Sequence, residues 1–133
     1  MIALDTNVLA RYLLDDEPRQ SAAARRLLSR ADQSFWVPIT VLLELAWVLK
    51  SRGVPRGVVV EAIRGLAALA NVQLQFPELV STALQIAEGG VDVADAIHLA
   101  LSGKAERLAT FDAQFVRQAR KLATIPPVEA IAV

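Results

Sequence analysis

Two carboxylates and one imidazole lie within a single apolar run, residues 91–100. If this run is a helix, Asp92 and Asp95 are neighbours on its surface, and His98 follows one turn after Asp95. Two like charges at that spacing repel each other unless a cation lies between them or one of them is protonated. A bound cation would therefore explain both acids. A simpler explanation, that Asp92 is the N-cap of the helix, accounts for Asp92 but leaves Asp95 unexplained.

Two more acids each follow a predicted strand. Asp5 comes directly after residues 2–4, which predict a short buried strand, and Asp112 follows a predicted strand at 107–110. In open α/β sheets, ligands bind beyond the carboxyl ends of the strands. Both acids also stand where a helix N-cap is expected, although Thr6 would cap the first helix equally well. Position alone leaves both explanations of Asp5 open.

Glu44 is the only charged residue between Pro38 and Leu49, in a predicted helix that is apolar nearly all round. We therefore expect this carboxylate to be buried, which is costly unless it is paired or bound to a metal. Thr40 is the predicted N-cap, but a capping box needs Glu or Gln three residues later, and that residue is Leu43. A salt bridge to a distant arginine remains an alternative to a functional role.

Together these acids predict a divalent metal site. The chain has no cysteine and one histidine, His98, which argues against a zinc site. Carboxylate oxygens suit Mg²⁺ or Mn²⁺. Such clusters activate a water and neutralise charge during displacement at a phosphodiester. The residue types alone do not distinguish a nuclease from a phosphatase.

The remaining pattern places these acids in one α/β domain, residues 1–133. Predicted strands alternate with helices, which indicates a parallel sheet with helices on both faces. Short helix–helix links after Leu14 and Gly53 predict a small helical arm in mid-chain. The five strands are predicted at 2–4, 34–37, 72–76, 107–110 and 123–125, and the helices at 8–14, 18–30, 41–49, 56–70, 77–88, 92–102 and 113–121.

Composition limits the remaining possibilities. The 133 residues are 54% apolar with zero formal charge, and no apolar run reaches the ~18–20 residues of a membrane helix. The absence of cysteine, and an opening without a basic segment, lead us to expect a cytoplasmic protein. Leu42 and Trp47 are expected in the core. Any nucleic acid would have to bind local basic patches, and two candidates are Arg19, Arg25, Arg26 and Arg30, and Arg117, Arg120 and Lys121.

Four sequence blocks follow one another along nearly the whole chain: residues 2–9 (IALDTNVL), 44–49 (ELAWVL), 92–100 (DVADAIHLA) and 108–112 (LATFD). In their order and spacing they resemble the PIN-domain ribonucleases. The single-domain size and the predicted mid-chain helical arm resemble, within that family, the VapC toxins of type II toxin–antitoxin modules.

This resemblance implies a three-layer α/β/α fold and a Mg²⁺- or Mn²⁺-dependent endoribonuclease that hydrolyses RNA phosphodiester bonds with a metal-activated water. Asp5, Glu44, Asp95 and Asp112 would be the catalytic, metal-binding acids. Asp92 would assist them, and the polar residues Thr6, Asn7 and Thr110 would order them. The resemblance also implies a cognate antitoxin that enters the acidic groove, and a homodimer. The alternative is a non-catalytic domain of the same fold that binds a partner.

Overall fold

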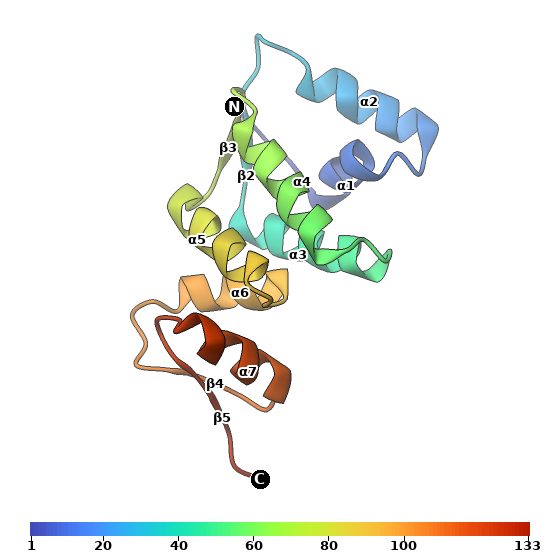
Figure 1. The fold of residues 1–133 in the computed structure, drawn as a ribbon. Helices are drawn as coiled ribbons and strands as arrows, with labels where there is room; N and C mark the ends of the chain where they lie inside the picture. The colour runs from blue at the N-terminus through green and yellow to red at the C-terminus, as the bar shows by residue number, and fades with distance from the viewer. The chain divides into compact units, whose positions relative to one another are not determined.

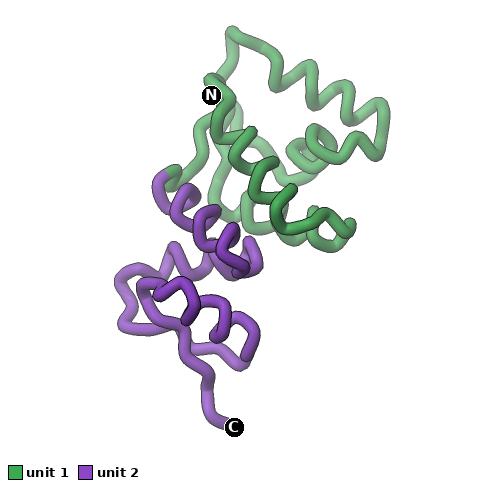
Figure 2. The backbone as a smooth tube through the Cα atoms, viewed as in Figure 1, with its two compact units in different colours: residues 1–77 green, residues 78–133 purple.

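A computed structural model describes all 133 residues and divides them into two compact units. Unit 1 comprises residues 1–77 and unit 2 residues 78–133 (Figure 2). The predicted single domain remains a prediction.

Unit 1 is built around three short parallel strands. Its four helices are labelled in Figure 1. The strands lie in the order β1-β2-β3, with Ile2 opposite Phe35 and Phe35 opposite Val72. In chain order its elements are β1 (Ile2–Ala3), α1 (Thr6–Leu14), α2 (Pro18–Leu28), β2 (Phe35–Val37), α3 (Ile39–Ser51), α4 (Arg56–Ala68) and β3 (Val72–Leu74).

The core of unit 1 depends mainly on α3 and the strand beside it. Phe35 on β2 and Leu42, Leu45 and Leu49 on α3 are almost completely buried. Helix α3 packs against α1 and α4, and α4 packs against β3. The two consecutive mid-chain helices α3 and α4 agree with the predicted helical arm.

Unit 2 contains three helices and a pair of parallel strands. They are α5 (Pro77–Glu88, whose first residue is the last of unit 1), α6 (Val93–Leu101), β4 (Leu108–Thr110), α7 (Ala113–Leu122) and β5 (Val128–Ala130). Helix α7 packs against β5 and against the turn before α6. At Gly89 a Cβ atom would lie 2.4 Å from Leu122, and Gly90 has a φ of +122°, so this turn requires glycine.

The predicted α/β fold with parallel strands is confirmed, and the structure contains seven helices. None of them is long and apolar enough to span a membrane.

Two local predictions in unit 1 are wrong. The first strand is not buried: both residues of β1 are exposed, and only the following Leu4 is buried. Thr40 does not cap α3, because the helix already begins at Ile39 after Pro38. The side chain of Gln75 accepts a hydrogen bond from the Ile39 N–H at 3.0 Å, so a residue 36 positions away satisfies this helix end.

The last predicted strand is also wrong. We expected it at 123–125, but β5 is Val128–Ala130. Ala123 instead ends α7 in a left-handed conformation, and Pro126 and Pro127 have no N–H to donate to a strand ladder. Pairing with β4 therefore starts only at Val128, opposite Leu108.

Candidate acidic site

Asp5 lies where β1 ends and α1 begins. It is exposed, and its Oδ1 accepts a hydrogen bond from the Thr6 N–H at 2.8 Å, so it is the N-cap of α1. Thr6 does not cap the helix: it is buried, and its Oγ1 has no hydrogen-bond partner. Asn7 is exposed in the first turn. Capping uses one carboxylate oxygen of Asp5 and leaves Oδ2 available to a ligand.

Glu44 is exposed, and the expectation that it is buried is wrong. Helix α3 has two faces in spite of its apolar composition. Its outer stripe follows the helical repeat through Thr40, Glu44, Trp47 and Ser51, while Leu42 and Leu45 are buried. Trp47 is 65% exposed, so its predicted place in the core is also wrong, whereas Leu42 is in the core as predicted. Burial therefore no longer argues for a role of Glu44, and the predicted alternative of a salt bridge is not observed either.

Asp92 and Asp95 meet in the first turn of α6. Asp92 is the N-cap of α6, which confirms the simpler of the two explanations given for it above. Its Oδ2 accepts a hydrogen bond from the Asp95 N–H at 3.3 Å. Both acids are half-buried, and Asp95 stands inside the helix, where a cap does not explain it. His98 is exposed in the last turn.

Asp112 repeats the arrangement of Asp5. It follows β4, caps α7, and accepts a hydrogen bond from the Phe115 N–H at 3.1 Å. Its own N–H donates to Oγ1 of Thr110 at 3.0 Å. Thr110 therefore holds the backbone of Asp112 in the conformation that the cap requires. The carboxylate itself is exposed to solvent.

The predicted acids belong to different units. Asp5 and Glu44 are in unit 1, and Asp92, Asp95 and Asp112 are in unit 2. In neither unit do three or more acids or histidines lie close enough together to hold a metal ion. The four-acid cluster therefore stays a prediction.

The acids nevertheless fit Mg²⁺ or Mn²⁺ in their chemistry. All offer carboxylate oxygens, which these hard cations prefer. No lysine or arginine forms an ion pair with Asp5, Glu44 or Asp112, so their charge is not already neutralised by the protein.

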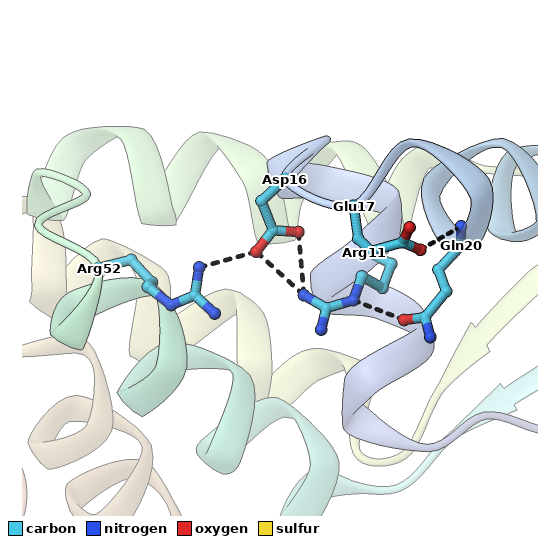
Figure 3. A network of polar contacts seen from close by, with 5 residues as sticks. All are labelled: Arg11, Asp16, Glu17, Gln20 and Arg52. Carbon is cyan, nitrogen blue, oxygen red and sulfur yellow. Dashed lines mark hydrogen bonds and ion pairs between the residues drawn. The ribbon is translucent and has the colours of Figure 1, made fainter.

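A second polar cluster in unit 1 was not predicted from the sequence (Figure 3). Asp16, between α1 and α2, accepts hydrogen bonds from Arg11 at 2.9 and 3.0 Å and from Arg52, at the end of α3, at 2.7 Å. The two guanidinium groups, Arg52 above all, lower the pKa of the Asp16 carboxyl below its usual value. Arg11 also donates to Gln20 at 2.7 Å, so the cluster joins three helices. The acidic run at residues 15–17, directly before the predicted helix at 18–30, is the only sign of this cluster in the sequence.

The comparison with protein families gives one result that bears on these acids. The model of the PIN domain matches residues 2–121, a range that runs through both units and includes every predicted acid. No curated protein matches the chain.

Proposed function

Because the chain belongs to the PIN domain family, whose members are commonly nucleases, we propose that it is a metal-dependent endoribonuclease. The observation that carries the proposal is the family match together with the carboxylates of Asp5, Glu44 and Asp112, which lie in the matched range and form no ion pair. Asp5 and Asp112 each follow a parallel strand and lie directly before a helix, as its N-cap. This is the edge at which α/β proteins bind ligands.

In this proposal Asp5, Glu44, Asp95 and Asp112 hold Mg²⁺ or Mn²⁺, and Asp92 assists. The bound ion would supply a water of lowered pKa and offset the negative charge of the phosphodiester. The proposal requires that these acids share one ion. Asp5 and Asp112 would contribute their free carboxylate oxygens while their other oxygens keep the helix caps.

Two of the three supporting polar residues contact an acid, Thr110 through its side chain and Thr6 through its backbone. Thr110 holds the backbone of Asp112 through its Oγ1, and the Thr6 N–H orients the carboxylate of Asp5. Asn7 is exposed beside Asp5 and would contact substrate or a metal-bound water. In the reaction, a bond forms between a water oxygen and phosphorus, the ester oxygen leaves, and the proton of the water passes to solvent or to the leaving oxygen.

The finer part of the proposal is that the chain acts in the cytoplasm as the toxin of a type II toxin–antitoxin module. An antitoxin segment would then cover the acids, and a homodimer would place two sites together. The support is the resemblance of the four sequence blocks, and a small upstream reading frame for a DNA-binding antitoxin would strengthen it.

The test is an RNA-cleavage screen of the full chain with Mg²⁺ or Mn²⁺, run beside Asp95→Asn. Structured RNAs such as tRNA and ribosomal RNA are the first substrates, with EDTA as the control. We expect metal-dependent fragments from the wild type and none from Asp95→Asn. Equal cleavage by both proteins would refute the proposal, and no cleavage by the wild type under any metal would favour the non-catalytic partner-binding alternative.

A further inference from the structure

The basic residues of unit 2 are unevenly distributed. Helix α7 carries three of the five lysines and arginines in this unit: Arg117, Arg120 and Lys121. All three are exposed, and none forms an ion pair. At 100° per residue they lie within an arc of about 100° on the helix. Phe115, Val116 and Ala119 are buried on the opposite face.

The other basic patch suggested by the sequence, Arg19, Arg25, Arg26 and Arg30, differs because some of its arginines form ion pairs. On and after α2, Arg25 pairs with Asp15 at 3.2 Å and Arg30 pairs with Asp32 at 3.0 Å. Half of that patch is thus already neutralised by neighbouring acids. The α7 patch is the one whose cations all remain available to an external anion.

An exposed aromatic residue precedes the same helix. Phe111 stands directly before the N-cap Asp112, the position from which an apolar residue often packs onto the fourth helical residue, here Val116. Val116 is buried, but Phe111 is 71% exposed, so most of its ring is not used in such a contact. The ring is therefore available for stacking.

We propose that Phe111, Arg117, Arg120 and Lys121, the α7 strip, bind single-stranded RNA, with the cations on its phosphates and the Phe111 ring against a base. Proteins that bind single strands combine cations along the backbone with aromatic stacking in this way. At 1.5 Å per residue, Arg117 lies about 7 Å and Lys121 about 13 Å along the helix from Asp112. The strip would hold the strand beside a predicted metal-binding acid. This inference rests on the proposed function for its ligand, but it is tested by binding alone.

The experiment measures the fluorescence anisotropy of a labelled single-stranded RNA of about 12 nucleotides, a length within the usual site sizes. It uses the full-length Asp95→Asn protein in EDTA, so that cleavage and metal binding do not contribute. The charge variant is Arg117→Gln/Arg120→Gln/Lys121→Gln. We expect an affinity loss of tenfold or more at low salt, and a salt dependence (log K against log salt) that is shallower by about 2, because each phosphate contact on a single strand contributes ~0.7.

The matched control is Arg25→Gln/Arg30→Gln/Arg64→Gln, which removes the same charge from paired arginines of unit 1. We expect its RNA affinity to stay within about twofold of that of the Asp95→Asn parent protein, because the control changes only the total charge of the protein. Equal losses in the two triple variants, or no loss in the α7 variant, would overturn the proposal. Binding of the α7 strip to anionic phosphatidylserine vesicles but not to RNA would overturn it as well.

Phe111 is tested separately from charge. Phe111→Ala should weaken RNA binding about fivefold or more with an unchanged salt dependence, and Phe111→Trp should restore it, because stacking of one base on an aromatic ring is sequence-tolerant and does not involve counterions. Unchanged affinity in Phe111→Ala would remove Phe111 from the strip. RNA binding that persists while the wild type fails to cleave would refute the proposed nuclease and not the α7 strip.

Discussion

Two groups of carboxylates in this chain have opposite surroundings. Two acids of the run at residues 15–17 have arginine partners: Arg25 for Asp15, and Arg11 and Arg52 for Asp16. The third, Glu17, caps α2 by accepting from the Gln20 N–H. Asp5, Glu44 and Asp112 have no cationic partner. The first group is also the most conspicuous acidic stretch in the sequence, yet its contacts are structural.

The difference shows that the partner of a carboxylate is more informative than local acid density. A carboxylate that already accepts hydrogen bonds from two guanidinium groups, as Asp16 does, has little capacity left for a metal. A carboxylate that only caps a helix keeps one oxygen and its full charge.

The largest expected effect is on catalysis. Asp5→Asn should lower metal-dependent RNA cleavage by more than 100-fold, because it removes a metal-binding charge while asparagine retains the helix cap. Asp16→Asn should leave the cleavage rate within about threefold of wild type. Rates are measured on the same RNA under single-turnover conditions. A greater loss in Asp16→Asn than in Asp5→Asn would reverse the assignment of the two groups.

The next largest effect contrasts the two faces of α3. Leu45 is fully buried, so Leu45→Ala should lower the free energy of unfolding by about 2–5 kcal/mol. Trp47 is 65% exposed, and Trp47→Ala should cost less than about 1 kcal/mol. Urea denaturation of both variants gives the comparison. A cost for Trp47→Ala as large as that for Leu45→Ala would show that this face of α3 is buried in solution.

A smaller effect separates the two roles of Asp112. Asp112→Ala should lower the free energy of unfolding by about 1 kcal/mol, because the Phe115 N–H loses its acceptor. Asp112→Asn should remain near wild-type stability, since asparagine caps equally well. Both substitutions should reduce cleavage, because both remove the charge. Full activity in Asp112→Asn would limit Asp112 to its structural role.

The smallest effect is the pH dependence of stability that Asp16 contributes. Its two arginine partners lower its pKa in the folded protein below the unfolded value of about 3.9. The charged pair therefore stabilises the fold above that pH, and this stabilisation is lost as the pH falls through the folded pKa. Asp16→Asn should have a lower Tm than wild type at pH 7, and the two Tm values should converge below about pH 4.

Melting curves from pH 7 to pH 2.5 test this prediction, with Glu106→Gln as an exposed carboxylate that forms no ion pair. The control should follow the wild type across the range. A constant difference between Asp16→Asn and wild type at every pH would mean that packing, not charge, explains the loss.

Helices, and the acids at their starts, were largely predictable from the sequence because caps and periodicity are local. Asp92 and Asp112 cap helices where the pattern predicted a helix start. The prediction that Glu44 is buried is wrong because an apolar helix can still expose one face to solvent. Its composition does not indicate which face lies against the core. The acceptor for Ile39 N–H is Gln75, a long-range contact that no local pattern contains. Shared metal binding by the acids requires an arrangement of both units, which the sequence indicates only through family resemblance.

The central claim of the proposed function is that Asp5 and Asp112 bind the same divalent ion, and a calorimetric Mn²⁺ titration tests it most directly. The proteins are wild type, Asp5→Asn, Asp112→Asn and the double variant. If the ion is shared, each single substitution weakens the same binding event, and the double variant loses much less than the sum of the two free-energy changes. Two independent binding events, each abolished by only one substitution, or no Mn²⁺ binding by the wild type, would contradict the claim.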